Sequence, residues 1–348
     1  MQSRSTALSL ENFDQAFIAL KPESASTTCG LIQLAQGLVS EFWIVQSESG
    51  QTLGRVGANR SALLQEIGFI GFFECSLAHP EVARVLLQEA KKWLKQQGAQ
   101  TILGPVDLST WFNYRFLQEE RTVGRSTPSV FSWEPQHPSQ YVEIWKQNGF
   151  REFHSYHTIG FEAPAGQYPP GVGGAKRAYE AALGLGFRFR DIRTDQLIEK
   201  EIPILHRITL EAFSGALLFE PLPLSDFTQL YVQGIQGLDY SISKIVETPQ
   251  GEAIGFAFGF MDQGHLILKT IAVLPEYQGK RLSSALTYPL MDDAVKRYQP
   301  TGFVSALVKS EATSEHLEKS HQREGAESWQ HHYSLFSWVC DSKEGAQL

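Results

Sequence analysis

The stretch from Ile271 to Leu286 (IAVLPEYQGKRLSSAL) restricts the fold more than any other part of the sequence. It starts as an apolar run ending at Val273, turns through Pro275 and Gly279, and continues with the spacing of an amphipathic helix. The first N–H groups of a helix have no partner inside it, and the macrodipole adds positive potential there. We therefore expect this turn to bind the pyrophosphate of a nucleotide-bearing cofactor.

The composition is that of a globular protein with room for two cores. The chain has 348 residues, which is long for one core and comfortable for two. Hydrophobic residues make up 42% and charged residues 20% of the sequence, which is ordinary for a globular protein. The formal net charge is −8, and this disfavours nucleic acid as the main partner because phosphate binding needs a basic surface.

Cysteine usage and hydropathy indicate a reduced, cytoplasmic protein. Cys29, Cys75 and Cys340 lie far apart without paired spacing, which disfavours a structural zinc site or a disulfide framework. Residues 1–20 contain acidic side chains and no continuous apolar run, so we expect no signal peptide. No apolar run approaches the ~18–20 residues that span a bilayer, and we expect no membrane partner.

The second half of the chain has the element order of an α+β domain. It follows residues 163–174 (APAGQYPPGVGG), whose prolines and glycines mark the expected domain boundary. A phosphate loop is the less favoured interpretation of these glycines, because no apolar strand leads into a fixed glycine pattern. Hydrophobic periodicity predicts helix 175–183, strand 187–192, helices 196–213 and 225–234, strands 240–247, 253–261 and 265–273, a helix to residue 298, strand 303–308, helix 313–323 and strand 329–339.

The first half resembles a fainter copy of the second. Residues 72–81 correspond to residues 272–276, and each segment is followed by a helix, a glycine and a short strand. The first copy lacks the Gln-Gly-Lys turn, so we expect one cofactor site per chain. Two unrelated α+β units are the alternative explanation. The predicted elements are helices 8–20 and 31–38, a hairpin of 41–46 and 52–59, strand 67–76, helix 80–97, strand 101–104, helix 141–148 and strand 151–161.

At the residues of the opening stretch, the sequence resembles the GNAT superfamily of acyl-CoA-dependent N-acyltransferases. The signature of that family is a strand ending V-x-P-x-[YF], followed by [QR]-x-x-G-x-[GA] at the head of a helix. Arg281 stands where the family has its second glycine, and Ser283 stands where it has Gly or Ala. The resemblance covers residues 187–340 and, more faintly, 30–161. The residues that match are Val273, Pro275, Tyr277, Gln278 and Gly279.

The resemblance implies an α+β fold of two tandem GNAT-like domains, each a mixed, mostly antiparallel central sheet flanked by helices. The implied bounds are 1–162 for a degenerate domain, 163–185 for a linker and helix, and 186–348 for an acyl-CoA-binding domain. Acetyl-CoA or CoA is the implied cofactor. Its pantetheine would lie along a strand edge and its pyrophosphate on the turn, where Lys280 or Arg281 could place a cation. A plain connection without a ligand is the alternative. The expected cofactor-binding residues are Ile271, Ala272, Val273, Gln278, Gly279, Lys280, Arg281, Leu282, Ser283 and Ser284.

Acetyl transfer to an amine needs a group that takes the proton of the amine and an acid near the leaving thiolate. In the family, a tyrosine on the last helix often serves as the acid. That position here is His321, with Tyr288 and Tyr333 as alternatives. Glu311, just past strand 303–308, and Glu220, in the loop before the second helix, are candidates for the base. Both carboxylates could equally be ordinary solvated side chains.

Four further residues have an interpretation from the sequence. His331 and His332 are adjacent on a predicted strand and so face opposite ways, which argues against a metal site. Lys269 lies on the cofactor strand and could face either the substrate or solvent. Pro289 interrupts the backbone hydrogen bonds of the predicted helix.

From these residues and the resemblance, we expect an N-acetyltransferase that moves an acetyl group from acetyl-CoA to a primary amine of a small molecule or peptide. The first domain would shape the acceptor site. One alternative is an aminoacyl or peptidyl transferase, which would need an aminoacyl-tRNA donor. The other is a non-catalytic acyl-CoA-binding module, which the substituted glycines and His321 favour. The sequence leaves the oligomeric state open.

Overall fold

The structure is a computed structural model, and its contacts divide the chain into two compact units, each containing segments from both halves of the sequence. Unit 1 consists of residues 1–118, 135–155 and 333–348, and unit 2 of residues 119–134 and 156–332. The residues that the structure describes are 13, 15, 16, 19, 20, 38–123, 131–309 and 328–340.

Unit 1 is built on an antiparallel meander covered by one long helix. The helix α2 (Pro80–Gln96) begins at a proline, whose missing N–H costs nothing at the first helical position. It ends before Gly98, whose φ of +88° suits the residue after a helix. The other elements with residues in unit 1 are β1 (Ser40–Gln46), β2 (Thr52–Arg60), β3 (Ile67–Cys75), β4 (Thr101–Gly104), β5 (Phe116–Val123), α3 (Gln140–Gln147), β6 (Arg151–Glu162) and β12 (Ser328–Val339).

The sheet of unit 1 has the strand order β1-β2-β3-β4-β12. All neighbouring strands are antiparallel except β3 and β4, which run parallel. The buried face of α2 packs on this sheet and forms one core with Trp145 of α3 and Phe336 of β12. The predicted hairpin, strands and helices of this unit are confirmed within the described residues, whereas β5 had not been predicted.

Unit 2 contains the stretch that the sequence singled out. Its sheet has the order β7-β8-β9-β10-β11-β6, and only β10 and β11 run parallel. Its elements are α4 (Val172–Gly184), β7 (Arg188–Asp191), a 3₁₀ turn (Thr194–Gln196), a π-helical turn (Leu197–Glu201), α5 (Ile202–Ala212), α6 (Leu224–Gly234), β8 (Lys244–Glu247), β9 (Ala253–Asp262), β10 (His265–Val273), a second 3₁₀ turn (Pro275–Tyr277), α7 (Leu282–Tyr298) and β11 (Gly302–Lys309).

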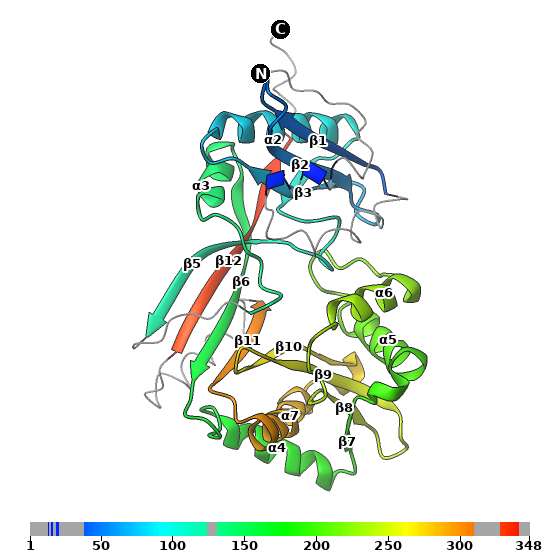
Figure 1. The fold of residues 1–348 in the computed structure, drawn as a ribbon. Coiled ribbons are helices and arrows are strands. Elements are labelled where there is room, and N and C mark those ends of the chain that lie inside the picture. Colours follow the sequence, from blue (N-terminus) through cyan, green and yellow to red (C-terminus); the bar gives the residue numbers. More distant parts are fainter. Residues whose placement is uncertain are drawn as a thin grey trace. The chain divides into compact units, whose positions relative to one another are not determined.

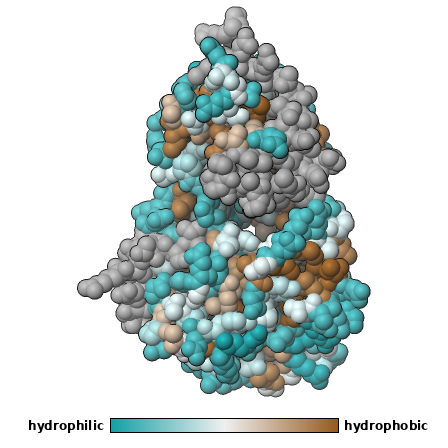
Figure 2. All heavy atoms as spheres, viewed as in Figure 1, coloured by the Kyte–Doolittle hydropathy of each residue, from teal (hydrophilic) through white to brown (hydrophobic). Residues whose placement is uncertain are grey.

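Helices cover both faces of the unit 2 sheet (Figure 1). A Cβ on Gly259 of β9 would lie 3.1 Å from Leu290 of α7, so this residue faces α7. Phe258, the preceding residue, faces the other way and contacts Tyr231 of α6. The helix α4 packs against α7, and α5 packs against β9 and β10. In Figure 2, hydrophobic residues gather on the visible surface over the region of α5.

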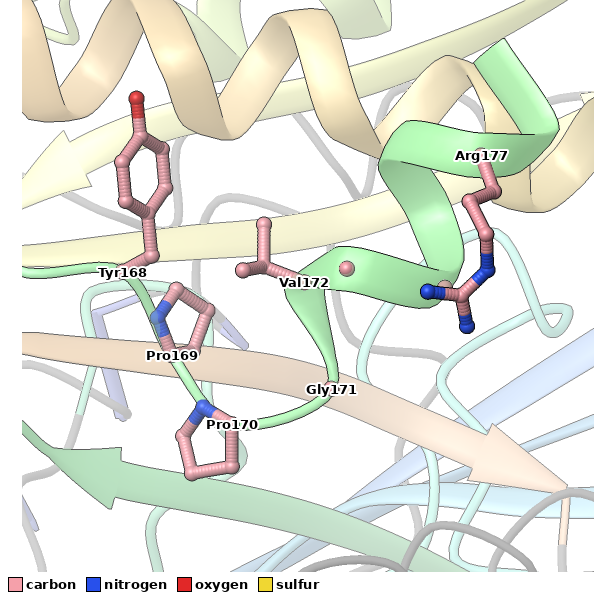
Figure 3. Close-up of a pocket in the computed structure, with 8 residues that line it drawn as sticks. Tyr168, Pro169, Pro170, Gly171, Val172 and Arg177 are labelled. Atoms are coloured by element: carbon pink, nitrogen blue, oxygen red, sulfur yellow. The ribbon is translucent and has the colours of Figure 1, made fainter. Parts of the chain in front are cut away.

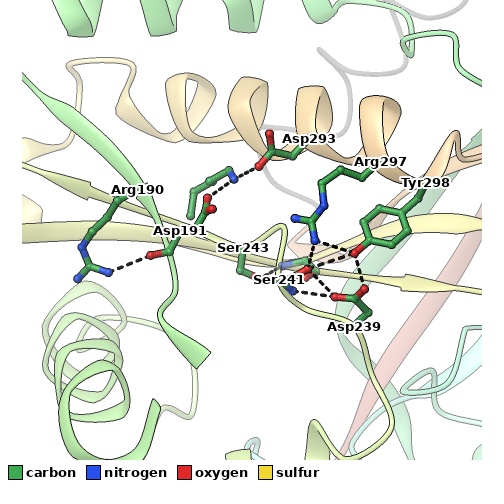
Figure 4. A network of polar contacts seen from close by, with 10 residues as sticks. Arg190, Asp191, Asp239, Ser241, Ser243, Asp293, Arg297 and Tyr298 are labelled. Atoms are coloured by element: carbon green, nitrogen blue, oxygen red, sulfur yellow. Dashed lines mark hydrogen bonds and ion pairs between the residues drawn. The ribbon is translucent and has the colours of Figure 1, made fainter. Parts of the chain in front are cut away.

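A polar network fixes α7 to the sheet (Figure 4). Lys244 of β8 is only 3% exposed, and its ammonium group contacts the carboxylates of Asp191 on β7 and Asp293 on α7. At the far end of α7, Tyr298 donates to Asp239. Hydrogen bonds from Ser241 and Tyr298 lower the pKa of Asp239. These contacts hold the helix, and therefore the turn that begins it, in a fixed place on unit 2.

The two halves of the chain exchange their last strands. β6 closes the first half of the sequence, yet its residues 156–162 belong to unit 2 and pair with β11. β12 closes the second half, yet its residues 336–339 pair with β4 in unit 1. The compact units therefore follow the exchanged strands, and the domain bounds 1–162, 163–185 and 186–348 remain a prediction about the two copies of the repeat.

The predicted fold class, α+β with mixed, mostly antiparallel sheets flanked by helices, is confirmed. Two boundaries in unit 2 differ from the prediction. The expected helix 196–213 is divided before α5 because Pro203 belongs to the first turn of a helix. The expected strand 240–247 starts only at Lys244, after a turn with a hydrogen bond from Ser243 N–H to the Tyr240 carbonyl oxygen. The predicted helix 313–323 and all of the predicted helix 31–38 except Leu38 lie outside the described residues.

Within the described ranges, no helix combines the length and the apolar character that crossing a membrane requires.

Candidate active site

Strands β10 and β11 start side by side and then separate, which leaves β10 with an open edge. Their register joins residues 265–268 of β10 to residues 302–305 of β11. Beyond this point β11 continues beside β6, while residues 270–273 of β10 pair only with β9 among the described strands. The N–H and C=O groups on this edge can bind an extended ligand as they would bind another strand.

A β-bulge lies where the two strands part. The pairing of β10 with β9 runs to Leu268 and resumes at Thr270, opposite Phe258, so Lys269 is an extra residue on β10. A bulge bends its strand and increases the local twist. Residues 268–271 are only half-buried, whereas Ala272 and Val273 are buried. The bulge therefore accounts for the divergence that opens the edge.

The segment between β10 and α7 forms a tight turn whose backbone requires a glycine. Gly279 has a φ of +79°, and a Cβ there would meet nothing within 4 Å. The requirement is therefore set by the backbone angle and not by lack of space. Gln278 donates from its backbone N–H to the Pro275 carbonyl oxygen and from its side chain to the Val273 carbonyl oxygen, at 3.1 and 3.0 Å. Gln278 thus shapes the turn with both of its donors, and its place among the cofactor-binding residues stays a prediction.

The N–H groups of residues 279–284 follow one another around this turn and the first turn of α7. None of them donates to another group of the described chain, and the first helical bond runs from Ala285 N–H to the Arg281 carbonyl oxygen at 3.0 Å. Gly279, Lys280, Arg281, Ser283 and Ser284 are exposed, and Leu282 is buried. A row of unused N–H groups at the positive end of a helix can bind a pyrophosphate.

The turn contains two basic residues, Lys280 and Arg281, which differ in conformation and contacts. Arg281 has a φ of 59°, the left-handed conformation that glycine adopts easily. The residue that replaces the second glycine of the GNAT signature thus keeps the backbone shape of a glycine, at a cost of roughly 1–2 kcal/mol. The ammonium group of Lys280 lies 4.8 Å from the centre of the Tyr277 ring, in a cation–π contact.

The corresponding edge in unit 1 is occupied by the chain itself. β3 and β4 also pair only at their start, through residues 67–69 and 101–103. Beyond this, Val106 donates its N–H to the Ile70 carbonyl oxygen at 2.8 Å, and Asp107 accepts the N–H of Phe72 at 2.5 Å. A Cβ on Gly71 would lie 2.1 Å from the Val106 carbonyl oxygen. Unit 1 therefore has no room for a pantetheine at this edge.

The turn after β3 also lacks the residues that bind an anion. Only residues 76–79 separate β3 from α2, whereas residues 274–281 separate β10 from α7. The difference agrees with the predicted loss of the Gln-Gly-Lys turn from the first copy.

The two residues proposed for catalysis, His321 and Glu311, lie outside the described residues and remain predictions. Of the alternatives, Tyr288 on α7 lies 5.4 Å from the ring of Tyr179 on α4, so it packs between two helices. Tyr333 is completely buried in unit 1. Glu220, in the loop before α6, is 8% exposed, so it is not the solvated carboxylate that the alternative interpretation expected.

His331 and His332 face opposite sides of their strand, as their spacing predicts. The Nδ1 atom of His331 lies 2.6 Å from Oε1 of Glu134, and both side chains are buried. His332 stacks on His157 with ring centres 5.0 Å apart. In the parts of the chain that the structure describes, no cluster of His, Cys, Asp or Glu residues could hold a metal ion.

Residues 131–134, which we call the strap, come from the first half of the sequence but lie on unit 2. Ser132 donates its N–H and its hydroxyl to Asp262 at 2.7 and 2.9 Å. Trp133 stacks on Phe258 with parallel rings 6.0 Å apart. Glu134 contacts His331, and burial raises the pKa of Glu134 although the hydrogen bond with His331 opposes this. The strap therefore lies on the face of the sheet that α6 also covers.

Sequence reasoning missed the strap and the Glu134–His331 pair. The partners of the strap lie about 130 to 200 positions further along the chain, at Asp262 and His331. No local periodicity links such distant residues. The local signal for the strap is limited to Phe131 and Trp133, whose aromatic side chains favour burial without indicating a partner.

A surface pocket lies around the start of α4, apart from the turn before α7 (Figure 3). It is lined by the proline- and glycine-rich residues 168–174 and by Arg177. Gly171 precedes the helix with a φ of 78°, and the guanidinium group of Arg177 is exposed. The preceding strand, β6, ends at Glu162 and does not lead directly into these glycines, so this segment fits a connection between the two halves better than a phosphate loop.

Comparison with known proteins places this geometry in a known fold. No protein-family model and no curated protein matches the sequence. A tandem GNAT protein from the clavulanic acid biosynthesis pathway matches the structure with a TM-score of 0.53 at 11% identity, over 99% of each chain. The chain has the tandem GNAT fold.

Two other solved structures support this fold assignment. A GCN5-related N-acetyltransferase from Anabaena variabilis matches with a TM-score of 0.52 at 10% identity, over 97% of this chain and 73% of that chain. A GCN5-related glucosamine N-acetyltransferase region in a fungal GH3 beta-N-acetylglucosaminidase matches with a TM-score of 0.52 at 12% identity. The chain covers only 38% of that longer protein, which in turn covers 97% of this chain. At these identities the likeness establishes the fold, and the chemistry has to be argued from the site.

Proposed function

We propose that this chain is an acyl-CoA-dependent N-acyltransferase that moves an acetyl group from acetyl-CoA to a primary amine of a small molecule or peptide. One observation carries the proposal: the open edge of β10, residues 270–273, leads directly into the turn with unused N–H groups at residues 279–284. A strand edge suits the amide groups of pantetheine, and the turn suits a pyrophosphate. The two sites adjoin in the order in which CoA carries these groups.

This order sets the direction of the cofactor. With the pyrophosphate at the start of α7, the pantetheine would run back along β10 from Val273 toward Thr270. The thioester would then lie near the bulge at Lys269, where β10 and β11 part. Of the predicted cofactor residues, Ile271, Ala272 and Val273 would supply edge groups, and Gly279 to Ser284 would supply N–H groups.

The reaction would follow the ordinary course of acyl transfer. The lone pair of the neutral amine attacks the thioester carbon, the carbon–sulfur bond breaks, and the electrons leave with the thiolate. The amine loses one proton and the thiolate gains one, so an amide and free CoA result. His321 and Glu311 are the residues we propose for the acid and the base. A base is needed because a protonated amine has no lone pair to attack with.

The acceptor would approach from the face that carries the strap and α6. Thr270 pairs with Phe258, and paired residues of antiparallel strands point to the same face. Trp133 of the strap lies over Phe258. The strap belongs to the first half of the sequence, which supports the expectation that this half shapes the acceptor site. We further propose a cytoplasmic location, which acetyl-CoA supply requires.

A transfer assay tests the proposal. The full chain would be incubated with acetyl-CoA and a panel of primary amines, with CoA release measured as free thiol and the acetylated amine measured by mass spectrometry. We expect equal amounts of CoA and N-acetyl product for at least one amine class. Acetyl-CoA binding without any product would instead support a non-catalytic acyl-CoA-binding module. Absence of acetyl-CoA binding would contradict the proposal and leave the aminoacyl or peptidyl transferase as the alternative.

A further inference from the structure

Aromatic side chains surround Phe258 at the centre of β9. Phe258 itself is 3% exposed. The ring of Trp133 lies parallel to it at 6.0 Å, and the ring of Tyr240 lies nearly parallel at 6.1 Å. The ring of Tyr231 stands against it edge-on at 6.0 Å. Trp133, Tyr231 and Tyr240 are all half-buried, so each keeps part of its ring surface accessible. We call these four residues the aromatic cluster.

The aromatic cluster lies next to the point where the open edge begins. Phe258 is the direct partner of Thr270, the first residue of β10 after the bulge. Phe260, which contacts both Phe258 and Trp133, is the partner of Ile267 just before the bulge. The cluster is therefore beside the place proposed for the thioester, and not beside the turn proposed for the pyrophosphate. A group bound on the cluster would be within reach of the reacting carbon.

The polar groups of the aromatic cluster are two phenol hydroxyls and the indole N–H of Trp133. Within the described chain, neither Tyr231 nor Tyr240 has a hydrogen-bond partner for its hydroxyl. Burial raises the pKa of both phenols, so they stay protonated at neutral pH and can donate to a ligand. Tyrosine suits such a site because it combines a flat apolar surface with one donor.

The carboxylates closest to the aromatic cluster along the chain are already engaged. Asp239 accepts hydrogen bonds from Ser241 and Tyr298. Asp262 accepts two from Ser132, and Glu134 is paired with His331. The aromatic cluster itself contains no carboxylate that could balance the second positive charge of a polyamine. The cluster therefore favours an acceptor with one amine and an apolar, flat body.

We propose that the acceptor is a small primary amine carried on an aromatic ring by a short linker, with the ring bound against Trp133 and the two tyrosines. This inference rests on the proposed N-acyltransferase function and names its substrate class. Offset-stacked and edge-on ring pairs gain stability beyond that of buried area alone. With the ring on the cluster, a linker of two or three atoms places the nitrogen toward Thr270 and the thioester.

Matched amines test this substrate class. The full chain with acetyl-CoA would be assayed with 2-phenylethylamine, with butylamine as an apolar amine without a ring, and with spermidine as a polycation. We expect kcat/KM for 2-phenylethylamine to exceed that for butylamine by about tenfold or more, as ring contacts of this kind imply. We expect spermidine to be the poorest of the three.

Substitutions in the aromatic cluster test whether the preference for an aromatic amine arises there. Trp133→Ala should lower kcat/KM for 2-phenylethylamine by about tenfold and lower that for butylamine clearly less, with the Kd of acetyl-CoA unaffected. Trp133→Phe keeps a ring and should retain most of the preference. Tyr240→Leu removes a second ring of the cluster while keeping an apolar side chain and should also lower kcat/KM for 2-phenylethylamine, so it serves if Trp133→Ala does not fold.

The results distinguish a wrong substrate class from a wrong proposed function. Turnover of acetyl-CoA with no preference for the aromatic amine, or a preference that survives both Trp133→Ala and Tyr240→Leu, would overturn the substrate class and leave the proposed function standing. Failure to bind acetyl-CoA at all would overturn both.

Discussion

At the scale of single residues, Gly279 and Arg281 carry the shape of the turn before α7. Both have positive φ angles, 79° and 59°, and Gly279 stands where a side chain would strain the backbone. The space around Gly279 is open, so backbone strain can be tested without a steric clash.

Replacing Gly279 with alanine should weaken acetyl-CoA binding while the fold persists. An alanine in the left-handed conformation costs roughly 1–2 kcal/mol, and relaxation of the turn would displace the N–H groups that follow. We expect about a tenfold rise in Kd, measured by isothermal titration calorimetry. Gly50→Ala is the matched control, since Gly50 has a φ of +83°, an equally open surrounding and a place in unit 1. Equal effects of the two substitutions on Kd would contradict the role of the turn.

Burial of Glu134 should make the free energy of unfolding fall as pH rises from mildly acid to neutral. Burial raises the folded-state pKa above the usual 4.5, so the unfolded chain releases this proton first as pH rises. The contribution of the protonated carboxyl to stability is complete below the unfolded pKa and is lost as pH rises through the folded pKa. Glu134→Gln should therefore flatten the fall of the unfolding free energy between mildly acid and neutral pH.

Urea denaturation at a series of pH values checks this expectation. Each unit of pKa difference corresponds to about 1.4 kcal/mol. Glu143→Gln, on the exposed side of α3, controls for the loss of one carboxylate. If Glu134→Gln and the unchanged chain show the same slope with pH, the raised pKa is not a feature of the folded state.

At the scale of secondary-structure elements, the two parallel strand pairs share one pairing pattern but differ in what lies beyond it. Both β3/β4 and β10/β11 pair only at their start. In unit 2 no described strand pairs with β10 beyond this start, whereas in unit 1 Val106 and Asp107 fill the corresponding edge. The chain therefore keeps one edge for a ligand and satisfies the other internally.

Asp107 should stabilise unit 1 by accepting the Phe72 N–H. Asp107→Ala leaves this partly buried donor without its acceptor, which costs about 1–3 kcal/mol. Asp107→Asn keeps an acceptor oxygen and should cost clearly less. Denaturant unfolding of the two variants measures the difference, and equal stabilities would show that the hydrogen bond contributes nothing.

Most of the helices and strands, and the turn before α7, could be predicted from the sequence. Strand 265–273, the turn at Gly279 and the helix to Tyr298 follow from local periodicity and turn chemistry, and the structure has them as β10, the turn and α7. The strap, the filled edge of unit 1 and the Glu134–His331 pair could not be predicted. Each joins residues far apart in sequence, and neither residue of such a pair carries a local sign of its partner.

At the scale of the whole molecule, the exchange of β6 and β12 makes each unit depend on both halves of the chain. The alternating pattern of residues 328–339 is the same whichever sheet it joins, so the sequence predicted the strand but not its place. β12 lies beside β4 in unit 1 because its residues 336–339 pair with residues 101–104, which are far away in the sequence.

Removing residues 333–348 should therefore destabilise unit 1, although most of that unit lies at the other end of the sequence. Loss of β12 exposes the edge of β4 and removes Phe336 from the core. We expect faster amide hydrogen exchange in β3 and β4, measured by mass spectrometry. A chain lacking only residues 342–348 keeps β12 and should exchange as the full chain does. Unchanged protection of β4 in the chain that lacks residues 333–348 would contradict the exchange of strands.

One chain should hold one acetyl-CoA, on the edge of β10 and the turn before α7. Isothermal titration calorimetry of the full chain with acetyl-CoA measures this binding. We expect saturable binding with one site per chain. Absence of binding at high micromolar acetyl-CoA, or two sites per chain, would contradict it.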